Sequence, residues 1–285
     1  MMEIPESNTI ARQLNETIQG KTILNVTACH SPHKFTWYFG DPSTYHELLS
    51  GFRIDRSLAV AGNVEIQAGD CRILLQDGVN LRYLPAGEEA PQKHQLFIEF
   101  DDFSRLTGTV QMYGGISAFR DGENENPYYL VGKEKPSPLG DEFDESYFQS
   151  LCGCPNFEKL SAKAFLATEQ RIPGLGNGVL QDILWNAGIH PKRKMVELSD
   201  AELTGLYRAV KDMLVEMTLK GGRDTERDLY GCSGGYRSVL SKNTVGQPCP
   251  ACGAPIQKEA YLGGSIYFCD QCQKYVKPVK HKGAK

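Results

Sequence analysis

The sequence has no apolar run long enough to span a membrane. A transmembrane helix needs about 20 consecutive, mostly apolar residues, and no run of that kind occurs in the 285 residues. The first residues also lack the basic segment followed by an apolar stretch that marks a secretory signal. We therefore expect a cytoplasmic protein with no membrane partner.

An excess of positive charge is also missing. The 31 Lys and Arg residues are outnumbered by 35 Asp and Glu residues, and the formal net charge is -4. Nucleic-acid-binding domains are more often basic. The charge is uneven, however, because the segment QKYVKPVKHKGAK (273–285) holds five lysines and no acid. A local basic face can outweigh the mean charge, since charge interactions are screened beyond about 8 Å at physiological salt.

No internal repeat is visible, and the length suits about two domains. An amphipathic helix is expected over residues 5–20, where Ile10, Leu14 and Ile18 recur every fourth position. Short β-type runs bounded by Gly, Pro, Asp or Asn then fill the region to residue 120, which favours an antiparallel sandwich or barrel. Within them, Asp77-Gly78 predicts a hairpin turn.

The second half of the sequence no longer shows the short β-type runs of the first half. We predict a sandwich domain over 1–125, a polar linker over 126–158, a helical domain over 159–240, and a small domain with a basic tail over 241–285. In the helical part, Ser199 to Glu202 reads as a capping box that starts a helix. The fold class is therefore α+β.

Nine cysteines are present, an odd number that favours thiols and metal ligands over disulfides in a cytosolic chain. Two C-x-x-C pairs, Cys249 with Cys252 and Cys269 with Cys272, have the spacing of a four-cysteine zinc site. Incidental free thiols or a redox pair are weaker readings of this spacing. We predict that these cysteines bind one zinc ion and that the segment between the two pairs forms a ribbon of two strands around Gly263-Gly264. The zinc should be structural, because four thiolates leave no open coordination position and so small a ribbon needs a metal to fold.

The order of these parts resembles the Fpg/Nei family, the formamidopyrimidine-DNA glycosylases and endonuclease VIII. The resemblance extends over essentially the whole chain. It is carried by the segments EIPES (3–7), KHQLFIEFDD (93–102), RIPGLGNGVLQDILWNAGIHP (171–191), GQPCPACGAPI (246–256) and YFCDQCQK (267–274). It implies an N-terminal helix with a β-sandwich, a helix–two-turn–helix domain, a zinc ribbon, and damaged double-stranded DNA as the partner.

Three residues of the helical domain match the family's phosphate-binding turn. Gly174 and Gly176 permit a close backbone turn, and free N–H groups at the following helix start suit an anion. Asn177 matches the family's phosphate-contacting Asn. A plain helix–helix turn is the alternative, although such a turn would not need both glycines and the Asn.

The chain departs from the family at its reactive groups. Met2 occupies the position of the family's nucleophilic proline, and we expect Met1 to be retained because Met2 is not small. Asn63 replaces the hairpin lysine, Met112 the arginine that fills the gap left by a flipped base, and Gly264 the ribbon's phosphate-binding arginine. The resemblance implies that Glu3 and Glu6 are retained catalytic-site residues.

Two mechanisms remain open for a chain with these changes. Glu3 could activate water for direct hydrolysis, giving a monofunctional glycosylase with weak strand cleavage. Alternatively, the amine of Met1 could be the nucleophile. A different class of function is a DNA-binding protein that has lost its chemistry. A zinc-ribbon transcription or RNA factor is disfavoured, because a ribbon alone does not explain the first two-thirds of the chain.

Two further stretches are candidate DNA contacts. The run from Cys29 to Phe39 interleaves aromatics with basic groups, so its rings could stack on bases and Lys34 could contact phosphate. A plain core strand is the favoured reading of that run. Met112 and Tyr113 could wedge between base steps. The segment RDLYGCSGGY (227–236) looks short for the family's lesion-covering loop, which disfavours tight recognition of an oxidised guanine.

Together these observations predict a monomeric DNA-repair protein, associated with a bacterial nucleoid, that removes a modified base. Its expected catalytic residues are Glu3, Glu6 and Met1.

Overall fold

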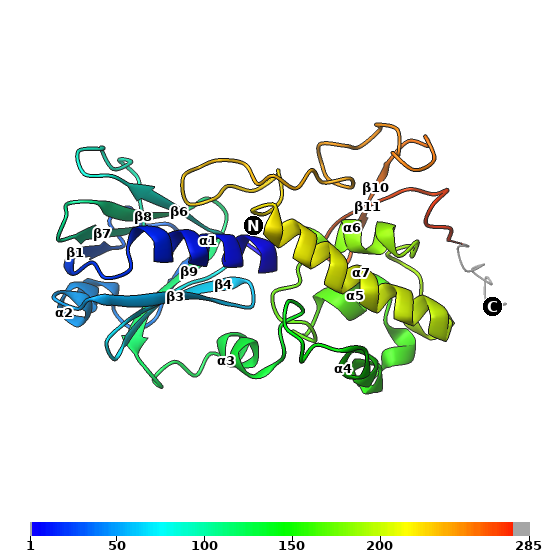
Figure 1. The fold of residues 1–285 in the computed structure, drawn as a ribbon, viewed down its shortest axis with the longest axis horizontal. Helices are drawn as coiled ribbons and strands as arrows, with labels where there is room; N and C mark the ends of the chain where they lie inside the picture. The colour runs from blue at the N-terminus through cyan, green and yellow to red at the C-terminus, as the bar shows by residue number, and fades with distance from the viewer. Residues whose placement is uncertain (1, 276–285) are drawn as a thin grey trace, which may run out of the picture. The chain divides into compact units, whose positions relative to one another are not determined.

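The computed structural model describes residues 2–275, and these form two compact units (Figure 1). The first unit contains the chain up to Phe143 together with 172–176 and 212–238. The second contains 144–171, 177–211 and the chain from Val239 onward. The expected range of the helical domain, 159–240, is thus shared between both units. Within the described residues, no helix has the length and apolarity to cross a membrane.

Two sheets make up the first unit. The four-stranded sheet has the order β1-β7-β8-β6, and the five-stranded sheet has the order β2-β9-β5-β4-β3. All neighbours run antiparallel except β2 and β9, which run parallel. The expectation of a purely antiparallel sandwich is corrected at that pair. The strands are β1 (Ile23–Ala28), β2 (Thr36–Tyr38), β3 (Ile54–Val60), β4 (Asn63–Ala68), β5 (Cys71–Leu75), β6 (Val79–Leu84), β7 (Leu96–Phe100), β8 (Arg105–Val110) and β9 (Gly114–Arg120).

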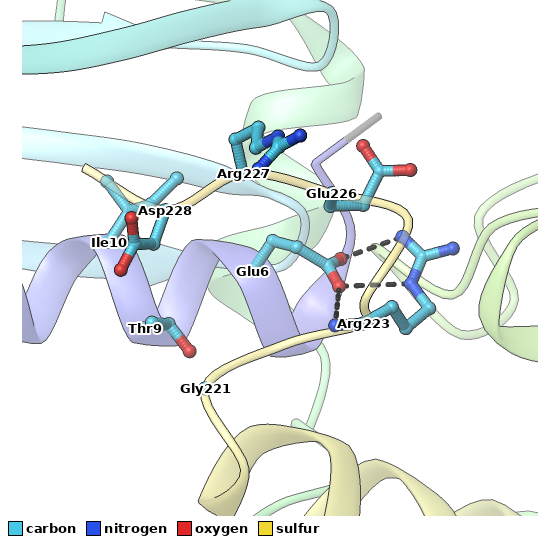
Figure 2. A pocket seen from close by; sticks show the side chains of 8 residues that line it. All are labelled: Glu6, Thr9, Ile10, Gly221, Arg223, Glu226, Arg227 and Asp228. Atoms are coloured by element: carbon cyan, nitrogen blue, oxygen red, sulfur yellow. Dashed lines mark hydrogen bonds and ion pairs between the residues drawn. The ribbon is translucent and has the colours of Figure 1, made fainter. Parts of the chain in front are cut away.

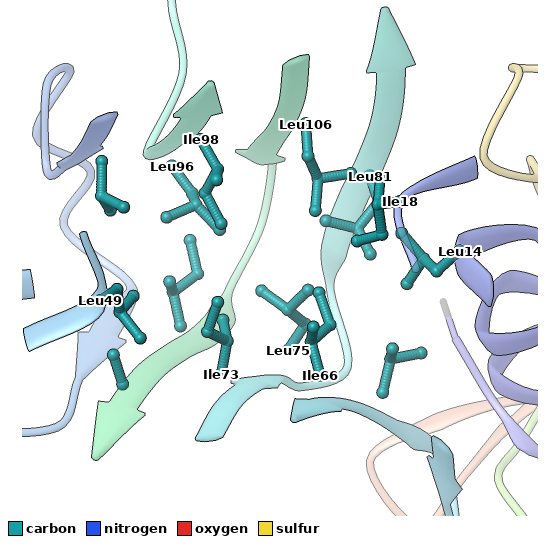
Figure 3. Packing of buried hydrophobic residues seen from close by; sticks show 14 of the residues in the cluster. Leu14, Ile18, Leu49, Ile66, Ile73, Leu75, Leu81, Leu96, Ile98 and Leu106 are labelled. Carbon is teal, nitrogen blue, oxygen red and sulfur yellow. The ribbon is translucent and has the colours of Figure 1, made fainter. Parts of the chain in front are cut away.

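Both sheets and two helices contribute to one apolar core (Figure 3). Alternate residues of the strands point into it, as the two-residue repeat of a half-buried strand requires. The long helix α1 (Ile4–Thr17) adds its buried face, and the short α2 (Tyr45–Leu49) adds Leu49. The labelled members are Leu14, Ile18, Leu49, Ile66, Ile73, Leu75, Leu81, Leu96, Ile98 and Leu106.

The predicted hairpin at Asp77-Gly78 is wrong. β5 before it pairs with β4 and β9, whereas β6 after it pairs with β8 in the other sheet. The dipeptide therefore carries the chain from one sheet to the other. Gly78 has φ +85°, and a Cβ there would lie 1.7 Å from the carbonyl oxygen of Tyr113, so the same glycine that favours a hairpin serves a tight crossing.

The predicted linker is largely ordered structure. It contains α3 (Pro127–Glu134) and α4 (Glu145–Ser150), each capped by the side chain of the preceding Asn126 or Asp144. In the first unit, α3 is held to the five-stranded sheet because the hydroxyl of Tyr129 donates to the buried carboxylate of Glu65 at 2.5 Å.

The second unit is helical with a two-stranded ribbon. Its main helices are α5 (Ala162–Ala167), α6 (Val179–Asn186) and the start of α7 (Asp200–Leu219), and its strands are β10 (Gln257–Tyr261) and β11 (Gly264–Phe268). The predicted capping box is present, since Ser199 Oγ accepts from Glu202 N and the Glu202 carboxylate accepts from Ser199 N. Short 3-10 turns cover η1 (Pro42–Thr44), η2 (Leu151–Gly153), η3 (Phe157–Lys159) and η4 (Met195–Glu197). The α+β fold class and the ribbon are confirmed.

Candidate functional site

A buried guanidinium lies between two carboxylates at the start of α1. Arg223 donates to Glu6 from its main-chain N and Nε at 3.0 Å and from Nη2 at 2.8 Å. Its Nη1 is 3.7 Å from Oε2 of Glu3. Figure 2 shows the carboxylate of Glu6 pointing from α1 toward the loop that carries Arg223. All three side chains are at least nine-tenths buried, so one cation and two anions share a dry site.

The charges in this cluster stabilise one another. Burial alone would raise the pKa of Glu6, but the charge and hydrogen bonds of Arg223 hold that pKa below its ordinary value of 4.5. Burial opposes the charge of Arg223, yet Glu3 and Glu6 raise the pKa of Arg223 above its ordinary value. The cluster therefore contains a permanent cation beside Glu3, at the positive end of helix α1.

Two glycines make room for Glu3. A Cβ on Gly176 would lie 2.5 Å from Oε1 of Glu3, so a larger residue there would displace the carboxylate. Gly174 has φ +79°, and a Cβ there would lie 2.3 Å from the main-chain N of Gly62. Its carbonyl accepts from Ile4 N at 3.1 Å. The structure thus gives both glycines a role in packing the start of α1, and their predicted contact with a DNA phosphate stays a prediction.

Two of the positions where the resemblance places reactive groups, Met2 and Asn63, lie near the start of α1. Met2 is 6 % exposed and belongs to the apolar core, while Met1 lies outside the described residues. Asn63 starts β4 opposite Val60, directly after Gly62. A Cβ on Gly62 would lie 3.3 Å from the carbonyl oxygen of Met2. The hairpin that would carry the family's lysine is therefore beside Met2, with an amide in place of an amine.

Met112 and Tyr113 form the loop between β8 and β9. Met112 is 72 % exposed, as a wedging side chain would need to be. The hydroxyl of Tyr113 donates to Asp77 Oδ2 at 3.3 Å. Burial, Asp77 and Glu3 together raise the pKa of Tyr113 to about 12, so this hydroxyl stays protonated at neutral pH.

The aromatic run before and in β2 is not a core strand. Phe35 is 48 % and Trp37 57 % exposed, which corrects the favoured reading of that run. Lys34 is exposed and lies over the ring of Phe35, with Nζ 5.3 Å from the ring centre. These exposed rings leave base stacking open as a prediction.

In the second unit, Asn177 lies beside the ribbon. Its Nδ2 donates to the carbonyl of Ser265 at 3.0 Å. Lys163 is almost fully buried, and its ammonium donates to the carbonyl of Tyr261 at 2.7 Å. A Cβ on Gly264 would lie 3.4 Å from Lys163 Nζ and 3.7 Å from Asn177 Nδ2. A lysine therefore lies next to the position where the resemblance places the family's ribbon arginine, and burial lowers the pKa of this lysine.

The four predicted zinc ligands converge. The sulfur atoms of Cys249, Cys252, Cys269 and Cys272 all lie within 4.8 Å of one another. The two knuckles face each other, with 3.4 Å between the sulfurs of Cys252 and Cys269. Four thiolates at this spacing suit tetrahedral Zn²⁺, and they leave no ligand position open. Cys152 and Cys154 belong to no such group among the described residues.

The ribbon is also anchored by protein groups. In α6, the side chain of Gln181 accepts from Tyr267 N at 2.9 Å, and the carboxylate of Asp182 accepts from the main-chain N of Val239 and of Leu240. Gln273 donates to the carbonyl of Ile189. The metal therefore acts together with buried hydrogen bonds in holding the ribbon.

Sequence reasoning missed Arg223 and Lys163. Arg223 follows Gly221-Gly222 directly after α7, and a charged residue after a pair of glycines is a weak signal. Lys163 has a clearer one, because it interrupts the apolar run AKAFLA of a short helix.

Known proteins resemble the chain over nearly its full length. A zinc finger found in FPG and IleRS matches residues 246–274. The formamidopyrimidine-DNA glycosylase of Lactococcus lactis subsp. cremoris is 27 % identical, with 96 % of this chain and all of the relative covered. That of Bacillus licheniformis is 29 % identical with the same coverage.

Solved structures show the same fold. MutM (Fpg) from Thermus thermophilus matches with a TM-score of 0.80 at 24 % identity, covering 95 % of this chain and 98 % of that one. The Lactococcus lactis Fpg in complex with DNA containing an abasic site matches with a TM-score of 0.81 at 23 % identity, covering 96 % of this chain and 100 % of that one. With the matching zinc finger and the full-length relatives, these findings show that the chain is similar to formamidopyrimidine-DNA glycosylases (Fpg) over nearly its whole length and shares their fold.

Proposed function

We propose that this protein is a DNA-repair glycosylase that removes a modified base from damaged double-stranded DNA by hydrolysis, with little or no strand cleavage. The observation that carries the proposal is the Glu3 carboxylate, held at the N-terminus of α1 beside Arg223 and given room by Gly176. Arg223 and the helix terminus place positive charge beside the Glu3 carboxylate, which in this proposal acts as the general base.

Glu3 acts on water in this proposal. The water oxygen bonds to C1′ of the damaged nucleoside while the N-glycosidic bond breaks and its electron pair leaves with the base. Glu3 accepts the proton that the water loses, and that proton is then available to the departing base. Arg223 holds the carboxylate in place and stabilises its charge.

The groups needed for strand cleavage are replaced. A Schiff base needs an amine nucleophile, and the buried thioether of Met2 stands where the resemblance places the proline. The amide of Asn63 cannot act as an amine either. The product we expect is therefore an intact strand with an abasic site.

DNA phosphates are held by the second unit in this proposal. Among the described residues, the Lys163 ammonium has one protein acceptor, the Tyr261 carbonyl, so two of its three donor positions remain for phosphate. Asn177 keeps a second amide hydrogen for the same purpose. The zinc ion, bound by the four cysteines, supplies no chemistry and fixes the ribbon beside these two side chains.

A second function, lesion binding without chemistry, is favoured by one observation. The substitutions at Met2, Asn63, Met112 and Gly264 remove four reactive or DNA-contacting groups from a chain that keeps the fold and the four-cysteine site. The two functions share a partner and differ only in reaction, so a chemical assay separates them.

The assay uses labelled duplexes that carry an oxidised purine, an oxidised pyrimidine, uracil or an abasic site. We expect breaks at one of the modified bases only after hot alkali, and no product trapped by borohydride. Breaks without alkali together with a trapped adduct would instead support the amine of Met1 as nucleophile. Tight binding with no breaks on any substrate would leave the non-catalytic function.

A further inference from the structure

A pocket in the first unit lies apart from the cluster of Glu3, Glu6 and Arg223. It has a volume of about 330 Å³ and lies between β2, the residue that follows β5, and the loop after β9. Its walls come from Trp37, Tyr38, Phe39, Gln76, Ser117 and the segment 123–126. Binding pockets for small organic groups begin at about this volume.

Polar groups inside this pocket lack protein partners. Ser117 is 7 % exposed and Asn124 is 6 % exposed. Within the described residues, Ser117 Oγ makes no hydrogen bond, and Asn124 uses only its Oδ1, which accepts from Asn126 N at 3.0 Å. Among the same described residues, the side-chain amide of Gln76, which is half-buried, makes no hydrogen bond either. None of these atoms is among the fully buried side-chain atoms without a partner, so they are accessible from the pocket and can hydrogen-bond to a ligand.

Trp37 supplies a flat face at the mouth of the pocket. Its side chain is 57 % exposed, and its ring centre is 6.3 Å from that of Tyr113. β2 pairs with β9 so that Trp37 lies opposite Gly115, two residues after Tyr113. The pocket is therefore next to the exposed loop of Met112 and Tyr113.

The charge of the pocket excludes a phosphate as its occupant. Glu123 and Glu125 are the charged residues of its wall, and no Lys or Arg of the described chain lines it. A planar ring with N–H groups on its edge fits both the exposed indole of Trp37 and the acidic wall. Such a ring stacks on indole, and its N–H groups donate to carboxylate and amide oxygens. A nucleobase has this chemistry.

We propose that this pocket holds an unpaired nucleobase of the bound duplex, the one left opposite the damaged nucleotide. The base stacks on Trp37, and Gln76, Ser117 and Asn124 hydrogen-bond its edge. The proposal rests on the proposed function, since damaged duplex DNA is its ligand, but it does not require that the protein cleave any bond.

The test compares two duplexes that each carry a tetrahydrofuran abasic analogue. In one duplex a guanine lies opposite the analogue, and in the other a second analogue takes its place. We expect the protein to bind the duplex with guanine more tightly, by about 5- to 150-fold, the range that stacking of one base on an aromatic ring gives. Trp37→Leu should bring this ratio close to one, Trp37→Phe should retain most of it, and Ser117→Ala should lower it.

Phe103→Leu is the matched control, because Phe103 is an equally exposed aromatic (61 %) outside the pocket. A ratio near one for the wild-type protein, or a ratio that Trp37→Leu leaves unchanged, would overturn the pocket proposal alone. Failure to bind either duplex would overturn the proposed function as well.

Discussion

Arg223 and Glu6 are joined by a main-chain and two side-chain hydrogen bonds, although 217 positions separate them in the sequence. Both groups are almost fully buried. Charges taken out of water are stable only when they are paired and hydrogen-bonded. This pair therefore ties the segment after α7 to the first helix, and it places a guanidinium where Glu3 can share it.

Arg223→Gln should strongly destabilise the protein. It leaves two buried carboxylates without their cation, and removing one partner of a buried pair costs about 3–5 kcal/mol of unfolding free energy. Thermal unfolding monitored in the first unit measures this loss. Arg227→Gln, in the same loop but exposed, should change little. The double variant Glu6→Gln/Arg223→Gln should lose less than the sum of the two single variants, and simple additivity would show that the pair is not coupled.

The stability of the protein should fall in acid. The folded-state pKa of Glu6 lies below the ordinary value of 4.5, so this group stabilises the fold above about pH 4.5 and the contribution is lost as the pH falls through the folded-state value. The charged groups near Glu6 are Arg223, Glu3, Glu226, Arg227 and Asp228. Unfolding measured between pH 7 and pH 3 should show a loss that is smaller in Glu6→Gln, and an identical pH profile for that variant would contradict the assignment.

Glu3→Gln should abolish base removal and leave DNA binding intact. The amide keeps the size of the carboxylate but cannot accept a proton, and loss of a general base costs about 10²- to 10⁴-fold in rate. Single-turnover excision followed by alkali measures the rate, and binding to an abasic duplex measures the affinity. Glu16→Gln, at an exposed acid near the other end of α1, is the control. Full activity in Glu3→Gln would remove Glu3 from the mechanism.

Much of the fold could be predicted because it depends on local patterns. The spacing of Ile10, Leu14 and Ile18 predicted α1, and the two C-x-x-C pairs predicted the ribbon, since each signal lies within a short stretch of the chain. β3 and β9 have weaker local signals than the other strands of the first unit. β3 mixes charged and apolar residues, and β9 begins with two glycines, so tertiary pairing and not local propensity makes them strands.

The candidate site could be predicted only in part. Glu3 and Glu6 were found through their place in the N-terminal motif. Arg223 was not, because its role depends on a long-range contact that no spacing rule reports. The hairpin prediction at Asp77-Gly78 was wrong for a related reason. A glycine with positive φ suits both a hairpin and a crossing between sheets, and the pairing of distant strands decides which of the two forms.

Removal of the metal should unfold the ribbon and weaken DNA binding. One Zn²⁺ per chain is expected, and its loss leaves four clustered thiols whose approach no longer has a stabilising ion. Chelation followed by a colorimetric zinc assay gives the stoichiometry, and binding to an abasic duplex gives the effect. Cys269→Ser should reproduce the loss. Cys232→Ser, at an exposed cysteine outside the cluster, should not. Unchanged DNA binding by the metal-free protein would show that the ribbon does not contact DNA.

Lys163→Met should weaken DNA binding in a salt-dependent way. The ammonium has one acceptor in the part of the chain that the structure describes, and it lies beside Asn177 and Gly264, so in our proposal it takes a phosphate. Each phosphate contact contributes about 0.9 to the slope of log affinity against log salt concentration. The variant should therefore lose about one unit of slope, whichever base the duplex carries. Lys159→Met, at an exposed lysine of the same unit, should keep the wild-type slope within a few tenths. If Lys163→Met lowers the affinity equally at all salt concentrations, the lysine supports the ribbon through the carbonyl of Tyr261 and does not contact DNA.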